Sequence, residues 1–168
     1  MSKYWVAGAT GFLGSHLVRT LTARGHEVVA VSKSGGEVEG VKVSAVDVLY
    51  EPAVAASASG VDGAFLVTGR VSRDRDDAEL LHRDNVLGTE AALRALKAAG
   101  VKRVVVASTS GTLAVSRDAD QIADESCRAP LEIIARWPYY RTKLYAEKAA
   151  LDANQPGVFE VVVVNPSL

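Results

Sequence analysis

The chain has 168 residues, enough for one domain with a substantial hydrophobic core. Nineteen basic and twenty acidic residues leave a net charge of -1 without a dense basic cluster, which argues against nucleic-acid binding. The single cysteine, Cys127, excludes a disulfide framework, and the three scattered histidines lack zinc-ligand spacing. Neither a signal-peptide core nor an apolar run of ~18 residues occurs, so we expect a soluble, cytoplasmic protein without a membrane span.

Six short runs rich in β-branched residues predict strands. They lie at residues 4–9, 27–32, 41–46, 63–68, 103–108 and 159–164. Helical periodicity between most of these runs predicts helices after Gly11, over about 76–99 and over about 139–154. The first helix carries its apolar stripe on Leu13, Leu17, Leu21 and Val18, and ends near Gly25. This alternation predicts an α/β, doubly wound parallel sheet in three layers (αβα), the Rossmann fold, as one domain over residues 1–168.

Two later stretches bear on function. In the helix over 76–99, one face carries Leu81, Asn85, Gly88, Ala92 and Leu96, so Asn85 is expected to point inward. Residues 111–137 form an irregular stretch too long for a passive connection in a compact domain. We therefore expect this stretch to face the substrate.

The turn after the first strand carries three glycines, Gly8, Gly11 and Gly14. A glycine turn leading into a helix leaves backbone N–H groups free at the positive end of the helix dipole, which suits a pyrophosphate. The usual dinucleotide fingerprint is Gly-x-Gly-x-x-Gly, and here Ala9 departs from that spacing. Taken alone, the pattern also fits a tight turn that only packs a helix on a sheet.

The residues after the second strand bear on the choice between NAD and NADP. An NAD-selecting carboxylate is expected about twenty residues after the glycines, but the sequence there reads Ser32, Lys33, Ser34. These side chains suit a 2′-phosphate and favour NADP, although Lys33 can also be an ordinary surface lysine. Asp47, after the third strand, stands where an acid can contact adenine, or it is a turn or cap residue.

Two groups of residues suggest acid–base chemistry. Tyr139 and Lys143 are four apart on a predicted helix and hence on one face. A phenol has a pKa of ~10, which a neighbouring ammonium can lower, although such pairs also occur by chance. Ser108, Thr109 and Ser110 follow the fifth strand, where a substrate carbonyl is expected to bind, or they form a simple polar turn. The glycine turn, the hydroxyls and the Tyr/Lys pair together make coincidence a poor explanation.

Several motifs resemble the extended short-chain dehydrogenase/reductases, the NAD-dependent epimerase/dehydratase family. The segments "GATGFLGSHLV", "VDGAFLVTG", "NVLGTEAALRALKAAGVKRVVVASTSGT", "YYRTKLYAEKAAL" and "VVVVNPS" carry the resemblance. It extends over nearly the whole chain. The segments "STSGTLAV" and "DESC" are most similar to the dihydroflavonol-reductase-like branch, whose members reduce ketones or aldehydes with NADPH.

The resemblance implies roles for matched residues. Tyr139 would be the general acid/base, Lys143 would lower its pKa and bind the nicotinamide ribose, Thr109 would orient the carbonyl, and Asn85 would help hold a proton-relay water. A basic residue at the position of Lys33 reads the 2′-phosphate in this branch. The cofactor contacts that we expect are Gly8, Thr10, Gly11, Phe12, Leu13, Gly14, Ser32, Lys33, Asp47, Val48, Val67, Tyr139 and Lys143.

The expected function is thus an NADP-dependent oxidoreductase, with NAD as the other candidate cofactor and a small carbonyl or alcohol as substrate. The alternatives are a nucleotide-sugar epimerase or dehydratase with tightly bound NAD, and a non-catalytic NAD(P)-binding module. Helices 76–99 and 139–154 resemble those that pair in dimeric relatives, so we expect a homodimer. The sequence departs from the family pattern in two places. The fourth predicted strand ends in "LVTG", where family members often have a His and two alanines. The family's smaller C-terminal substrate domain is expected to be absent or truncated.

Overall fold

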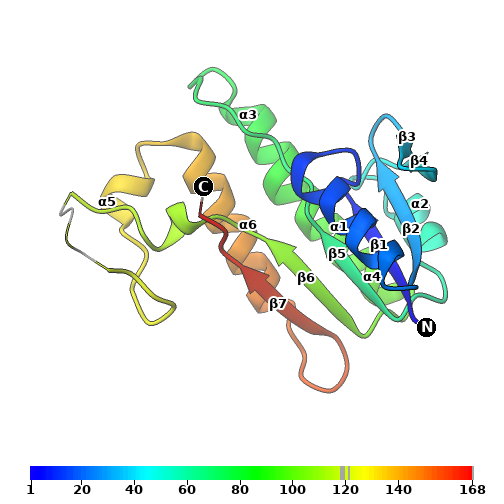
Figure 1. Cartoon of the computed structure of the whole chain (residues 1–168). Coiled ribbons are helices and arrows are strands. Elements are labelled where there is room, and N and C mark those ends of the chain that lie inside the picture. The colour runs from blue at the N-terminus through cyan, green and yellow to red at the C-terminus, as the bar shows by residue number, and fades with distance from the viewer. Residues whose placement is uncertain (118–119, 121, 168) are drawn as a thin grey trace.

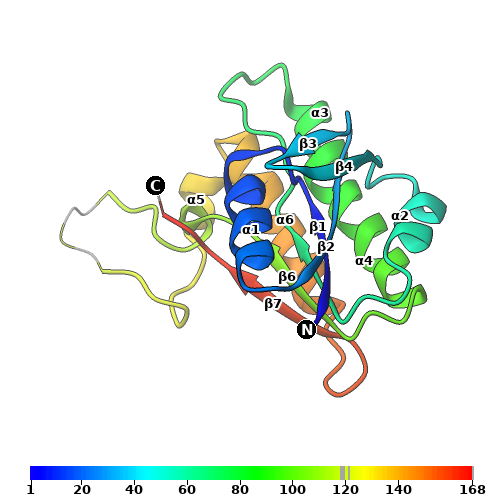
Figure 2. The ribbon, with the colours of Figure 1, turned by 45° about the vertical axis from the view of Figure 1, so that its right-hand side comes forward.

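The computed structural model describes residues 1–117, 120 and 122–167, which form a seven-stranded sheet with helices on both faces (Figures 1 and 2). The strands are β1 (Lys3–Ala7), β2 (Glu27–Ser32), β3 (Gly36–Val38), β4 (Val41–Ala45), β5 (Gly63–Leu66), β6 (Arg103–Ala107) and β7 (Glu160–Val164). Their spatial order is β3-β4-β2-β1-β5-β6-β7. All pairs are parallel except β3 with β4, so the predicted doubly wound fold is confirmed.

Strand β3 is not among the predicted strands. This strand has three residues and pairs antiparallel with β4 across a tight turn in which Glu39 has φ 48° and Gly40 has φ 81°. So short a segment has no room for the alternating pattern that marks a strand. The other six strands lie where they were predicted, within three residues at each end.

Helices cover the sheet unevenly. They are α1 (Phe12–Ala23), α2 (Glu51–Ser57), α3 (Ala78–Leu81), the π-helix η1 (His82–Leu87), α4 (Gly88–Ala98), the 3₁₀ helix η2 (Ser110–Thr112), α5 (Leu131–Ile134) and α6 (Pro138–Asp152). Figures 1 and 2 show α1 on one face and α2, α4 and α6 on the other. On the α1 face, Val162 and Val164 of β7 are 45% and 40% exposed.

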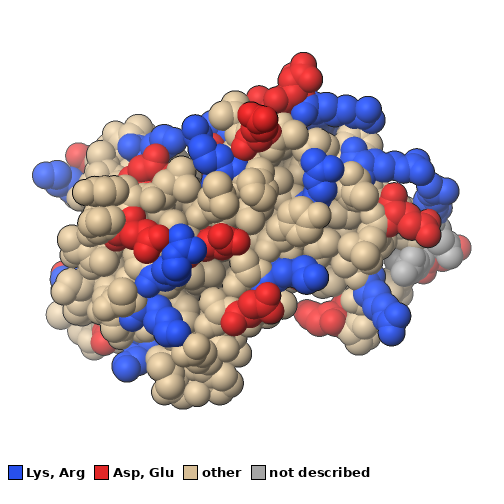
Figure 3. Space-filling model, turned by 180° about the vertical axis from the view of Figure 1, so that it is seen from behind, with Lys and Arg blue, Asp and Glu red and all other residues tan. Residues whose placement is uncertain are grey.

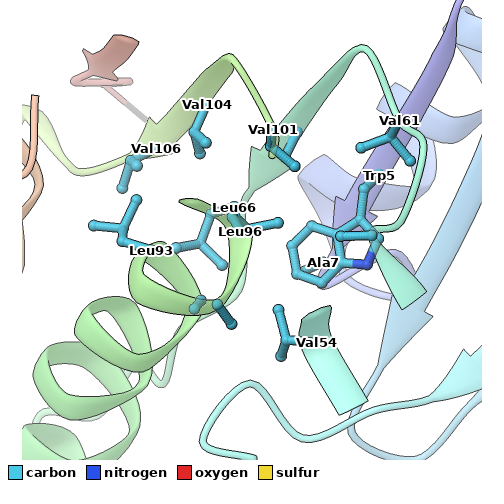
Figure 4. Close-up of a cluster of buried hydrophobic side chains, with 14 of the residues drawn as sticks. Trp5, Ala7, Val54, Val61, Leu66, Leu93, Leu96, Val101, Val104 and Val106 are labelled. Carbon is cyan, nitrogen blue, oxygen red and sulfur yellow. The ribbon is translucent and has the colours of Figure 1, made fainter. Parts of the chain in front are cut away.

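Two hydrophobic clusters join the layers. The larger one packs Trp5 of β1 against Val54 of α2 and Leu93 and Leu96 of α4 (Figure 4). The smaller one packs Val18 and Leu21 of α1 against the other face of the sheet, and these are the most deeply buried members of the predicted stripe. Because β1 is central and buried on both faces, its side chains are continuously apolar from Trp5 to Ala7.

The helix predicted over 76–99 is present, but its middle is a π-helix. The elements α3, η1 and α4 follow one another without a break. The predicted inward face is buried, and it includes Asn85 in the middle of η1. A π-turn carries one extra residue per turn and is found frequently at functional sites. Apolar periodicity does not reveal such an insertion, because the buried face continues through it.

The surface carries no dominant charge on the face that Figure 3 shows, where acidic and basic side chains are interspersed. Surface ion pairs such as Lys3–Glu27 and Arg94–Glu51 join the two signs locally. Within the described part of the chain, none of the helices is both long enough and apolar enough to cross a membrane. The same residues contain no group of three or more potential metal-ligating side chains.

Candidate active site

A cavity of about 310 Å³ opens at the carboxyl ends of β1, β2, β4 and β5. In open α/β sheets this edge is where ligands bind. The lining residues are Ala7, Gly8, Val31, Ser32, Lys33, Val46, Asp47, Val48, Leu49, Thr68, Gly69, Arg70 and Asp84. The cavity is therefore where the glycine turn meets the carboxyl ends of β2 and β4.

The glycine turn is built so tightly that two of its glycines exclude a side chain. Gly8 has φ +82°, and a Cβ there would lie 2.9 Å from backbone atoms of Val67 and Thr68. At Gly14 a Cβ would lie 2.0 Å from the carbonyl oxygen of Gly8. The bare backbone brings the N-terminus of α1 up to the turn, and Gly11 at its N-cap offers no side chain to cap the first N–H groups. These features suit a pyrophosphate, which would bind to the free N–H groups.

The end of the cavity beside β2 and β4 carries the cation Lys33 and the carboxylate of Asp47. Lys33 Nζ lies 3.2 Å from Asp47 Oδ2, and the lysine side chain is 64% exposed. The hydroxyl of Ser32 is buried and donates to the carbonyl oxygen of Gly35 at 3.2 Å, so it is less open to a phosphate than we expected. Lys33 and the exposed Ser34 remain open to solvent.

Tyr139 lies in the first turn of α6, and its phenol is in contact with the side chain of Thr109, the N-cap residue of η2. Burial raises the pKa of Tyr139 above its ordinary value, and the side chain of Thr109 lowers it in part. The raised pKa keeps the phenol protonated at neutral pH. Lys143 is not among the causes of this shift, and its ammonium donates to another acceptor. That Lys143 lowers the pKa of Tyr139 stays a prediction.

That acceptor is the backbone of β6. Lys143 Nζ donates to the carbonyl oxygen of Ala107 at 2.6 Å, and the side chain is buried. Burial lowers the pKa of Lys143 to about 8, although the carboxylate of Glu147 acts in the opposite direction. Lys143 thus titrates close to physiological pH, which is typical of functional sites.

Asn85 connects the π-helix to the cavity wall. Its Oδ1 accepts from the backbone N–H of Arg70 at 2.7 Å, and its Nδ2 donates to the carbonyl of Arg70 at 3.0 Å and to Thr142 Oγ1 at 3.2 Å. A Cβ on Gly69 would lie 3.1 Å from Asn85 Oδ1 and 4.0 Å from Lys143 Nζ. The glycine in "LVTG" therefore lets the cavity wall approach both residues. That Asn85 helps hold a relay water stays a prediction.

The structure brings most of the predicted site residues to one edge of the sheet. Gly8, Ser32, Lys33, Asp47 and Val48 line the cavity. The predicted contacts outside its lining are Thr10, Gly11, Phe12, Leu13, Gly14, Val67, Tyr139 and Lys143. Of the three hydroxyls after β6, Thr109 faces Tyr139, whereas Ser108 donates to Glu147. Within the predicted substrate-facing stretch 111–137, residues 118, 119 and 121 lie outside the described residues.

Arg70 and Asp84 are not among the residues predicted for the site. Both line the cavity, where Arg70 Nε lies 2.8 Å from Asp84 Oδ2 and Arg83 Nη2 lies 2.9 Å from Asp84 Oδ1. These two arginines lower the pKa of Asp84, although burial opposes them. Arg70 lies in the loop that follows β5, so the predicted strand places it near the carboxyl edge of the sheet. Its ion pair with Asp84 has no sequence signal.

A sheet that is parallel except at one edge strand, a bare glycine turn and a cavity at the carboxyl edge are typical of a dinucleotide-binding fold. The model of the NAD dependent epimerase/dehydratase family matches residues 4–168. The chain belongs to that family, as the resemblance in its motifs predicts.

Individual relatives agree with this assignment. A 4-hydroxy-2-methyl-3-oxo-4-farnesyl-3,4-dihydroquinoline-1-oxide ketoreductase of Stigmatella aurantiaca is 37% identical over 98% of this chain and 49% of its own length. A dihydroflavonol 4-reductase of Callistephus chinensis is 29% identical over 97% of this chain and 50% of its own. Among solved structures, MoeE5 in complex with UDP-glucose and NAD is 31% identical, with a TM-score of 0.77 over 96% of this chain and 52% of its own. The chain thus spans about half the length of the curated relatives it matches.

Proposed function

We propose that the protein is an NADP(H)-dependent oxidoreductase that reduces a ketone or aldehyde. The observation that supports this best is the contact of Tyr139 with Thr109 just after β6, at the carboxyl edge of the sheet where the cavity also opens. Relatives of similar sequence are named as reductases of ketones and of dihydroflavonols. For this protein we propose only the same chemical class of substrate, a carbonyl compound, and not the particular substrates of those relatives.

The side chains divide the chemistry among them. When bound, the nicotinamide cofactor supplies a hydride to the carbonyl carbon. Thr109 holds the carbonyl oxygen, and Tyr139 Oη gives its proton to that oxygen as the alcohol forms. The raised pKa of Tyr139 suits this direction, because a general acid must be protonated before it can donate. Lys143 places a buried positive charge one helical turn away, which stabilises the phenolate that remains.

The preference for NADP over NAD rests on the end of β2. Solved neighbours contain NAD, and the family is described as NAD dependent. In this chain the corresponding loop carries Lys33 in place of the expected carboxylate, with the exposed hydroxyl of Ser34 beside it. We propose that a 2′-phosphate displaces Asp47 from Lys33 and takes its place in the ion pair.

Two other functions use the same fold. A nucleotide-sugar epimerase or dehydratase is favoured by the similarity to MoeE5, whose structure contains UDP-glucose and NAD. Such an enzyme would be purified with NAD bound, which makes the cofactor content of the purified protein the discriminating observation. A non-catalytic NAD(P)-binding module needs only the cavity and has no use for the contact between Tyr139 and Thr109.

We also propose a homodimer in the cytoplasm. A groove of about 360 Å³ runs between α3, η1 and α6, and Leu87 and Tyr145 in its wall are exposed. These exposed apolar side chains, beside charged residues such as Arg83 and Arg141, suit the corresponding helices of a second copy. A reducing compartment agrees with a chain whose one cysteine, Cys127, is free.

The test of the proposed reaction compares Tyr139→Phe with Tyr145→Phe, an exposed tyrosine on the same helix. Consumption of NADPH is followed with a dihydroflavonol, an aromatic ketone and an aromatic aldehyde. We expect wild type and Tyr145→Phe to turn over at least one of them and Tyr139→Phe to be slower by roughly 100-fold or more. Full turnover by Tyr139→Phe would contradict the role of the phenol.

A further inference from the structure

A buried carboxylate lies directly behind the candidate catalytic residues. Glu147 follows Lys143 by one turn of α6 and is only 8% exposed. Its Oε2 accepts from Ser108 Oγ at 2.6 Å, from Thr112 Oγ1 at 2.9 Å and from Asn165 Nδ2 at 2.9 Å. Burying a charged group is costly unless hydrogen bonds compensate, and here three donors do so, two from the stretch after β6 and one from the residue after β7.

Those donors surround Thr109. Ser108 precedes it, and the hydroxyl of Thr112 lies 2.9 Å from the carbonyl oxygen of Thr109. Asn165, just after β7, donates to the same carbonyl oxygen at 3.2 Å. The hydroxyl of Thr109 in turn accepts from the N–H of Gly111 at 3.3 Å. One carboxylate oxygen therefore fixes the segment that presents the Thr109 hydroxyl to Tyr139.

The charge of Glu147 also acts on Lys143. Burial drives the pKa of Lys143 down, and the Glu147 carboxylate raises it, so that it stands at about 8. Tyr139 is the other titratable group on the same face of α6. From β6 the neighbour is the uncharged carbonyl of Ala107, and from the π-helix it is the uncharged Asn85, while Asp84 is already bonded to Arg70 and Arg83. Glu147 is thus the carboxylate that keeps Lys143 a cation near neutral pH.

We propose that Glu147 is a positioning residue that serves both partners of Tyr139: it fixes the Thr109 segment and holds the positive charge on Lys143. It lies on α6 against the segments that follow β6 and β7, and it is not part of the cavity lining, so it acts through other residues. The roles of Thr109 and Lys143 in this statement rest on the proposed function. The contacts and the charge coupling do not, and they can be measured without turnover.

The charge coupling is tested with Glu147→Gln, and with Asp152→Asn as a control that removes one exposed carboxylate from the same helix. The readout is an NMR titration of lysine side chains in the protein without added cofactor, with the Lys143 signal assigned by its loss in Lys143→Arg. We expect the titration midpoint of Lys143 to fall by about one pH unit in Glu147→Gln. It should not move in Asp152→Asn. An unchanged midpoint in folded Glu147→Gln would overturn the proposal.

The geometric half is tested separately, and this keeps the proposal open to refutation if Glu147→Gln fails to fold. Ser108→Ala removes the shortest hydrogen bond to Glu147 but leaves its charge in place. We expect the midpoint of Tyr139, followed by NMR of labelled tyrosines, to rise because its contact with the Thr109 side chain, which lowers the pKa of Tyr139, loosens. A midpoint equal to that of wild type would refute the geometric role.

Turnover provides the link to function. With a carbonyl substrate that the wild type reduces, Glu147→Gln should lower kcat by at least tenfold and move the alkaline limb of its pH profile to lower pH, with little change in the KM for NADPH. A lower kcat with an unmoved limb would assign Glu147 a merely structural role. If no substrate is turned over while the NMR midpoints shift, the proposed function fails and the coupling through Glu147 stands.

Discussion

Replacing Gly14 by alanine tests the tight approach of α1 to the glycine turn. In an exposed helix interior, alanine is favoured over glycine by about 1 kcal/mol, so local propensity alone predicts a more stable protein. The structure predicts the opposite. A Cβ at this position would lie 2.0 Å from the Gly8 carbonyl oxygen, 2.7 Å from its carbon and 2.9 Å from Ala9 Cα, whereas ordinary contact begins at 3.4 Å.

Relief of this clash needs a separation of backbone from backbone, since no flexible side chain is involved. Overpacking a well-packed site costs typically about 1–3 kcal/mol and sometimes more, and a backbone clash of this depth belongs at the upper end. We expect Gly14→Ala to lower the free energy of unfolding by about 3 kcal/mol. Because the movement also opens the turn around Gly8 and Gly11, the affinity for NADPH should fall with it.

Gly25→Ala is the matched control. Gly25 has φ +76°, but a Cβ there would meet nothing within 4 Å, so only backbone strain of about 1 kcal/mol is expected. Urea unfolding followed by circular dichroism gives both values, and titration with NADPH gives the affinities. A Gly14→Ala variant that is as stable as Gly25→Ala and binds NADPH like the wild type would refute this reasoning. The turn would then not need α1 to approach it so closely.

Three further outcomes follow from the site. Asn85→Ala should lower the free energy of unfolding by about 2 kcal/mol in urea, because it leaves the backbone N–H and carbonyl of Arg70 without their partner; a loss below 0.5 kcal/mol would contradict this. Between pH 8 and 10.5, Lys143 binds a proton in the unfolded chain that it has lost in the folded protein. The free energy of unfolding of the wild type, relative to that of Lys143→Met, should therefore rise by about 1 kcal/mol per pH unit in this window. A difference that does not change with pH would refute the lowered pKa. Tyr145→Arg should convert a dimer to a monomer in sedimentation at micromolar concentration, and a wild type that already sediments as a monomer would exclude the proposed dimer.

The fold could be read from the sequence because its signals are local. The strands of a parallel sheet are short and rich in β-branched residues, and glycines such as Gly25 and Gly100 end the helices in positive φ. The π-helix over 82–87 and the three-residue strand β3 escaped prediction for the same reason. Each depends on backbone hydrogen bonding that the order of apolar residues does not specify.

The site was only partly predictable. Residues with a characteristic spacing along the chain, such as Tyr139 and Lys143, can be recognised as a motif. Residues that directly follow a predicted strand can be placed at the carboxyl edge of the sheet, but their individual contacts cannot be predicted. The contacts of Glu147 with Ser108, Thr112 and Asn165 join positions 18 to 39 residues apart, and no periodicity predicts them. The hydrogen bond of the Lys143 side chain to the carbonyl oxygen of Ala107 depends on packing in the same way.

The measurement that bears most directly on the proposed cofactor site is a fluorescence titration of the purified chain with NADPH and NADH in parallel. We expect both to bind, NADPH more tightly, and Lys33→Ala to lose at least tenfold in NADPH affinity while its NADH affinity stays unchanged. A folded chain that binds neither cofactor would contradict the assignment of the cavity between Gly8, Lys33 and Gly69 as a dinucleotide site.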